Sequence, residues 1–242
     1  MYRVLVLIVM IVMIVSIHRL CNNIEIFRYA TGRPGPTILL LAGTHGNEPA
    51  GRVMLQRYID NARVGKPSPL SMWKKGTLLI VPCANRSGCF LGSRWMWHRV
   101  RHNDLNRNYA EEGSEPVSQR IIQLILAEQV ELIVDFHEGW GFHLQQPKSI
   151  GSTLTPTTPL MRALSLSIVD ELNANITNPG KHFSVRNETD HLPTLRNFAT
   201  RNGLDYILVE TTGIDEVQPL STRLAHVDCI VRRVISSAQQ TV

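Results

Sequence analysis

Four short and strongly apolar runs recur along the 242-residue chain, at Thr37–Gly43, Thr77–Pro82, Leu132–Phe136 and Tyr206–Val209. Runs of this length that are apolar at successive positions are typical of strands covered on both faces. A further strand is expected at Ile24–Ala30. Helical spacing of apolar residues is found at Ala50–Ala62, after Ser114, at Pro159–Leu172 and at Pro219–Ile235. Strands that alternate with helices predict an α/β sandwich, with helices on both faces of the sheet.

The rest of the composition suits one folded enzyme-sized domain. No stretch resembles a linker, so we expect residues 24–242 to fold together. The net charge of +5 is spread along the chain, and its densest basic cluster is Arg94, Arg99, Arg101 and Arg107. Nucleic-acid binding would call for a basic helix or an aromatic-basic groove, and the sequence has neither. We therefore expect no nucleic-acid partner and favour a small acidic substrate.

The N-terminal segment is the most apolar part of the sequence. Val4–Ile17 is apolar apart from Ser16, and as a helix it would span about 21 Å, short of the roughly 30 Å hydrocarbon core. A signal peptide, an uncleaved anchor and a buried strand are the alternatives, although the run is longer than most strands and no small-residue cleavage site follows it. We expect residues 1–23 to be an anchor or signal segment, with a transmembrane helix in the first case. The protein would then be membrane-associated or exported, on a side of the membrane that the sequence leaves open.

The four cysteines have no metal-type spacing. Cys83 and Cys89 can pair if the protein is exported, and buried free thiols are the default expectation.

Polar residues that carry chemistry follow the apolar runs. His45 and Glu48 come after the first run, and His137 ends the third in the equivalent place. Two histidines and one carboxylate are the protein ligands of many catalytic zinc sites, which leave a fourth position for water. We predict that these three residues hold one zinc per chain, the alternative for His137 being a core histidine. Glu210 ends the fourth run, where a carboxylate is costly unless it is used, and we predict that it is the general base.

A second polar group lies in the long segment after the second run. Asn106 and Arg107 place an amide beside a guanidinium, a combination that suits a substrate carboxylate. Arg99, seven residues before Asn106, is close enough to present a cation to a developing oxyanion. Arg94 and Arg101 are rivals for that role.

Four motifs together resemble the zinc carboxypeptidase superfamily, and within it the succinylglutamate desuccinylase/aspartoacylase branch. They are His45-x-x-Glu48, Asp104-Leu-Asn-Arg-Asn108, Asp135-Phe-His137 and Val209-Glu210. The similarity extends from about Ile24 to the C-terminus. It implies a mixed, mostly parallel eight-stranded sheet, zinc at the matching His45, Glu48 and His137, and Glu210 as general base. Arg99 matches the arginine that polarises the scissile carbonyl in the deacylases.

The chain departs from this pattern in two respects. No tyrosine lies between Tyr109 and Tyr206, which argues against a digestive-type carboxypeptidase. Thirty-two residues follow Glu210, so we expect this chain to lack the C-terminal β-domain that narrows the pocket of many deacylases, and to have a more open pocket.

These patterns predict a zinc-dependent hydrolase of an amide or ester bond in a carboxylate-bearing substrate, of the N-acyl amino acid deacylase type. One alternative is a carboxypeptidase or amidase acting on cell-wall or other short peptides. A second is a non-catalytic binding module on the same fold, against which the intact Glu210 argues. The oligomeric state and the acyl group are left open.

Overall fold

The computed structural model describes residues 23–98, 101–110, 115–188 and 190–240. Its main sheet has seven strands among these residues, in the order β1-β3-β2-β6-β9-β7-β8. The strands are β1 (Phe27–Ala30), β2 (Thr37–Ala42), β3 (Thr77–Val81), β6 (Leu132–Gly139), β7 (Thr153–Pro156), β8 (Ser184–Val185) and β9 (Asp205–Thr212).

The four apolar runs form the centre of this sheet. β3, β2, β6 and β9 are parallel neighbours, and β7 and β8 form a second parallel pair. β1 and β7 join the central strands antiparallel. The predicted mixed, mostly parallel sheet is therefore confirmed, although the described residues form seven strands where the resemblance implied eight.

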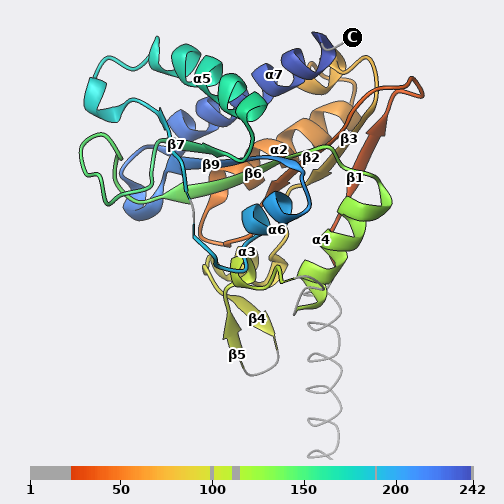
Figure 1. The fold of residues 1–242 in the computed structure, drawn as a ribbon, viewed down its shortest axis with the longest axis horizontal. Helices are drawn as coiled ribbons and strands as arrows, with labels where there is room; N and C mark the ends of the chain where they lie inside the picture. The colour runs from red at the N-terminus through yellow and green to blue at the C-terminus, as the bar shows by residue number, and fades with distance from the viewer. Residues whose placement is uncertain (1–22, 99–100, 111–114, 189, 241–242) are drawn as a thin grey trace, which may run out of the picture.

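Helices cover both faces of the sheet (Figure 1). The layer on one face is α2 (Pro49–Arg63), α5 (Pro159–Asn173) and α7 (Leu220–Gln240), which pack against Ile38, Leu40 and other alternate residues of the strands. The layer on the other face is α4 (Pro116–Ala127) and α6 (Leu195–Arg201), which pack against Leu39, Leu41 and Ile133. Each central strand is thus buried on both sides, which explains its largely apolar sequence and confirms the three-layer sandwich.

The long polar segment after β3 holds short elements of its own. They are α3 (Arg86–Leu91), the antiparallel pair β4 (Met96–His98) and β5 (Arg101–Asn103), and a 3-10 turn at Leu105–Arg107. Other 3-10 turns lie at Pro69–Met72, Pro179–Lys181 and Ile214–Glu216.

The membrane predictions need correction. In the part of the chain that the structure describes, no helix has both the length and the apolar character needed to cross a bilayer. This finding contradicts the predicted transmembrane helix and membrane-associated location, and neither is retained. Val4–Ile17, on which they were based, lies outside the described residues.

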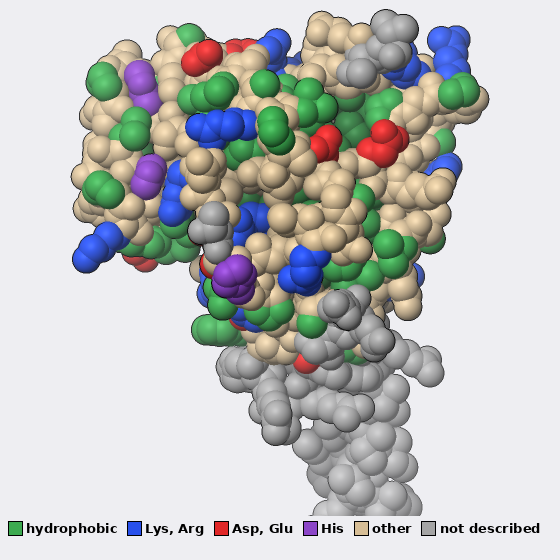
Figure 2. All heavy atoms as spheres, in the orientation of Figure 1, with side chains coloured by type: hydrophobic (Ala, Val, Ile, Leu, Met, Phe, Trp, Pro, Cys, Tyr) green, Lys and Arg blue, Asp and Glu red, His purple; other side chains and the backbone are tan. Residues whose placement is uncertain are grey.

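The surface and the thiols bear on two further expectations. Lys and Arg side chains are scattered over the face drawn in Figure 2 rather than gathered over one element. Cys83, Cys89 and Cys229 are half-buried free thiols. Cys83 and Cys89 therefore follow the default expectation of unpaired thiols.

Candidate active site

The loop after β2 carries the first two predicted ligands in a fixed conformation. The chain turns at Gly43, whose φ of +68° suits glycine. Three residues later Gly46 packs so tightly on α3 that a Cβ there would collide with the backbone of Gly88. Its N–H also donates to the carbonyl of Ser93, at 2.9 Å. The loop therefore has little room to move. It holds His45 and Glu48 in place at the carboxyl end of β2.

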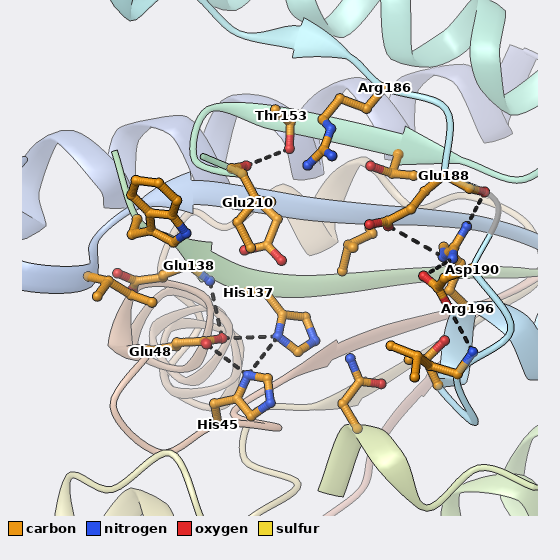
Figure 3. A pocket seen from close by; sticks show the side chains of 18 of the residues that line it. His45, Glu48, His137, Glu138, Thr153, Arg186, Glu188, Asp190, Arg196 and Glu210 are labelled. Atoms are coloured by element: carbon orange, nitrogen blue, oxygen red, sulfur yellow. Dashed lines mark hydrogen bonds and ion pairs between the residues drawn. The ribbon is translucent and has the colours of Figure 1, made fainter. Parts of the chain in front are cut away.

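His45, Glu48 and His137 converge on one point, as Figure 3 shows. His45 Nδ1 lies 2.7 Å from Glu48 Oε1 and 3.1 Å from His137 Nδ1. His137 Nδ1 lies 3.0 Å from Glu48 Oε2. All three side chains are buried, and one ligand atom from each lies within 4.8 Å of the others. The residues predicted as ligands are thus brought together from β6 and the β2–α2 loop, and the group could hold a metal.

The outer nitrogen of each imidazole faces a carboxylate. His45 Nε2 lies 3.0 Å from Asp104 Oδ1, and Arg94 Nη2 donates to the other oxygen of Asp104 at 2.9 Å. His137 Nε2 lies 3.2 Å from Asp135 Oδ2, within ion-pair distance although not aligned as a hydrogen bond. Metal-ligating histidines are commonly oriented by such carboxylates, so this arrangement fits a metal centre.

The charges in the cluster are strongly coupled. Burial alone would raise the pKa of Glu48, but the nearby His45 and His137 outweigh it and lower that pKa to about 2. Burial would lower the pKa of His137, but Asp135 and Glu48 outweigh it and raise the pKa well above its ordinary value. The carboxylates thus favour positive charge at this point. A divalent cation held by His45, Glu48 and His137 would supply that charge, so the donor set fits zinc.

Glu210 lies beside the cluster on the neighbouring strand. In the β6–β9 ladder it is the register partner of His137, and Figure 3 shows its carboxylate on the same side of the sheet. It is buried, and its Oε2 has no hydrogen-bond partner among the described residues. Burial raises the pKa of Glu210 to about 8, against the opposing effect of His137. A buried carboxylate with raised proton affinity beside a metal-ligand cluster is suited to move protons.

A cavity of about 220 Å³ opens from the cluster along the sheet. It lies on the face that α4 and α6 cover, over the strands β9 and β7, and α6 contributes Arg196 to its lining. Asn106 and Arg107 line it. Asn106 Oδ1 accepts from the N–H of Leu195 at the start of α6 (3.2 Å), and Arg107 Nη1 donates to the carbonyl of Asn106 (2.8 Å). Arg107 is exposed at the cavity rim, where a solute can reach it.

Of the arginines considered for the oxyanion role, Arg94 alone has a side chain within the described part of the chain. Arg99 lies outside the described residues, and so does the side chain of Arg101. Of the three rivals, Arg94 is described: it lines the cavity, with Nη1 3.3 Å from His45 Nδ1 and 3.5 Å from Glu48 Oε1.

Several cavity residues carry no signal that the sequence analysis recognised. Arg186 extends the cavity beyond Glu210, and the structure gives its guanidinium no ion pair within the described ranges. Arg196 is buried in an ion pair with Asp190, at 2.6 Å. Glu138, next to His137, pairs with Arg223 of α7. The Glu-Gly that follows His137 was the available sign, because a second carboxylate on a buried strand needs a partner.

Comparison with known protein families places these motifs in context. The family model of the succinylglutamate desuccinylase/aspartoacylase catalytic domain matches residues 34–143. The match includes His45, Glu48 and His137 and ends before Glu210. A curated relative, the N-alpha-acetyl-L-2,4-diaminobutyric acid deacetylase of Halomonas elongata, is 28% identical over 108 residues, which are 43% of this chain and 29% of that protein.

Solved structures share the fold across most of the chain. The cell shape determinant Csd4 of Helicobacter pylori, in its apo form, matches with a TM-score of 0.73 and 19% identity, over 90% of this chain and 55% of that chain. Another structure of Csd4, described as a D,L-carboxypeptidase and bound to mDAP, matches with a TM-score of 0.70 and 19% identity, over 88% of this chain and 54% of that one. A putative metallopeptidase from Shewanella denitrificans matches with a TM-score of 0.63 and 18% identity, over 89% of this chain and 79% of that chain.

The chain therefore spans 29% of the curated relative's length and 55% of the Csd4 chain. Within that span, the resemblance that the four motifs predicted is confirmed, and so is the carboxypeptidase-like fold.

Proposed function

We propose that this chain, similar as it is to the deacylase branch of the zinc carboxypeptidases, is a zinc-dependent hydrolase of N-acyl amino acids. The bond cleaved is the amide, or an ester in its place, of a substrate with a free carboxylate. One observation carries the proposal: the convergence of His45, Glu48 and His137 in a cavity that also holds the buried Glu210.

His45, Glu48 and His137 would hold the zinc, which when bound supplies a Lewis acid that makes water more acidic and polarises a carbonyl. Glu210, buried beside the cluster, would accept the proton of the attacking water and return it to the leaving nitrogen. Burial of the cluster keeps bulk water away from these charges and strengthens their interactions.

The rim residues supply the substrate preference. Arg107 offers a guanidinium fork, and Asn106 keeps an amide N–H free because its oxygen is engaged by α6. Together they would bind the substrate carboxylate while Arg99 faces the carbonyl under attack. The expected substrates are N-acyl amino acids and short peptides with a free C-terminal carboxylate.

The proposal is tested with matched pairs of N-acetyl amino acids, one free acid and one C-terminal amide, on zinc-loaded protein. We expect hydrolysis of the free acids and a kcat/KM lower for the amides by a factor of about 30 or more, because the amide leaves a guanidinium unpaired. Arg107→Ala should remove most of that difference by acting on the free acid alone. The control is Arg120→Ala, an exposed arginine on α4 that lies outside the cavity lining. No release of amino acid from any substrate would overturn the deacylase assignment, and equal rates on acid and amide would overturn the role of Arg107.

A second candidate activity is a carboxypeptidase for short peptides. It is supported by the Csd4 fold similarity, which covers more of this chain than the deacylase match does. The two activities are separated by offering acetylated amino acids and unacetylated tripeptides of the same C-terminal residue. A higher kcat/KM for the tripeptide would assign the chain a carboxypeptidase activity in place of the deacylase activity, with the same zinc ligands and the same general base.

A further inference from the structure

Helix α2 begins directly after a predicted metal ligand, Glu48. The carboxylate of this residue cannot both bind a metal and cap the helix. Glu48 is the N-cap residue of α2, and its side chain makes no capping hydrogen bond. Its carboxylate points instead to His45 and His137. Pro49 has no N–H, so the first backbone donor of the helix is Ala50. This donor is buried and needs an acceptor from outside the helix.

The acceptor is Glu138, the residue after the ligand His137. Its Oε1 accepts from the N–H of Ala50 at 2.5 Å, and its own backbone N–H donates to Glu48 Oε2 at 3.1 Å. Glu138 therefore caps the helix in place of Glu48, and its N–H at the same time helps to hold Glu48 Oε2, the oxygen that also faces His137. The two contacts form a closed loop between strand β6 and the start of α2.

The carboxylate of Glu138 is itself held in place by a residue of α7. It is buried and pairs with the buried guanidinium of Arg223, in the first turns of α7. Arg223 Nε donates in turn to the carbonyl of Gln218, at 3.1 Å. Gly213, just after β9, packs so closely that a Cβ there would collide with Glu138 Oε2. A buried charge held by a buried partner and walled by backbone has one position available to it.

From these contacts we propose that Glu138 is a positioning residue: it caps α2 in place of Glu48, and thereby leaves Glu48 oriented as a metal ligand. Arg223 and the close approach of Gly213 hold Glu138 in that position. The inference rests on the proposed zinc site, and its consequence is that zinc affinity depends on residues that do not touch the metal.

The experiment measures the dissociation constant for zinc by competition with a chromophoric chelator, on variants shown to be folded by circular dichroism. Glu138→Ala is expected to weaken zinc binding by about 10- to 100-fold. Glu138→Gln keeps an oxygen for Ala50 and should recover much of the loss. Gly213→Ala leaves both charged residues in place and displaces the carboxylate, so it should also weaken binding. The control is Arg232→Met, which removes an exposed ion pair with Asp228 from the same helix.

The outcomes separate this inference from the proposed function. If the unmodified protein binds no zinc, the proposed function fails. If it binds zinc and Glu138→Ala binds it equally well, Glu138 is only structural and the inference fails. If Glu138→Ala does not fold, Gly213→Ala and Glu138→Gln decide: unchanged zinc affinity in both would overturn the inference, and a loss that is larger for Gly213→Ala would support it.

Discussion

At the scale of single residues, the environment of Glu210 decides what the cluster can do. Three buried side chains could bind a metal without performing any chemistry, as in a binding module. Glu210 adds a carboxylate with one oxygen unpartnered within the described part of the chain and a pKa raised by burial to about 8. Such a group retains protons that an ordinary glutamate would release, and therefore suits proton transfer at neutral pH.

We expect Glu210→Gln to bind zinc as tightly as the unmodified protein and to lower kcat by a factor of about 10² to 10⁴. The amide has the size of the carboxylate and cannot accept the proton. Zinc content by elemental analysis and turnover of an N-acyl amino acid check the two halves of this expectation. Undiminished turnover would show that another group is the base.

The residues that could be predicted from the sequence were those whose spacing carries meaning. His45 and Glu48, three apart after a buried strand, and His137 at the equivalent place predicted one cluster, and the structure brings them together. Glu138 could not be assigned in the same way, because its partners Ala50 and Arg223 are far from it in sequence. A contact that depends on where α7 docks leaves no local pattern.

At the scale of elements, the long strands and the short β1 were predictable, and the other short strands were not. β2, β3, β6 and β9 are buried on both faces, so each contains a largely apolar run. β7 and β8 have four and two residues, too few to give a recognisable apolar run, and Thr153 and Thr155 of β7 are polar residues that line the cavity. β6 and β9 also continue past their apolar runs to Gly139 and Thr212, since each pairs with the other along its whole length.

Helix α7 carries a buried histidine that should make folding sensitive to acid. His226 packs edge-to-face on Phe183, with ring centroids 5.0 Å apart, and burial lowers its pKa to about 4 from an ordinary 6.5. The unfolded chain therefore binds a proton more readily than the folded one. The stability that results is complete above pH 6.5 and is lost as the pH falls towards 4, by about 2 kcal/mol at pH 5.

Urea unfolding at pH 7.5 and pH 5 should thus show a larger loss of stability in the unmodified protein than in His226→Leu. The exposed His191 provides the control, since His191→Leu should leave the difference between the two pH values unchanged. An equal loss in His226→Leu and the unmodified protein would mean that other groups cause the acid sensitivity.

At the scale of the whole molecule, the predicted ligands tie together two parts of the sheet. His45 and Glu48 lie between β2 and α2, and His137 lies on β6. Zinc bound by all three would stabilise the folded state over the unfolded one. For residues 24–242 alone, which we predict to fold as a unit, free zinc at 100 times its dissociation constant should raise the free energy of unfolding by about 2.7 kcal/mol.

Chemical unfolding with zinc and with a chelator measures this difference directly. His137→Ala should show the same stability under both conditions, because it lacks a ligand. A zinc effect of equal size in His137→Ala would place the metal elsewhere on the chain.

The tight seat of Gly46 against Gly88 has a calorimetric consequence. A loop without room to move is already in its final shape when the cation arrives, so binding orders no additional backbone and buries little apolar surface. Titration calorimetry at several temperatures should accordingly give a heat of zinc binding with almost no temperature dependence, after correction for buffer protonation. A large negative heat-capacity change would instead mean that the loop carrying His45 takes shape around the ion.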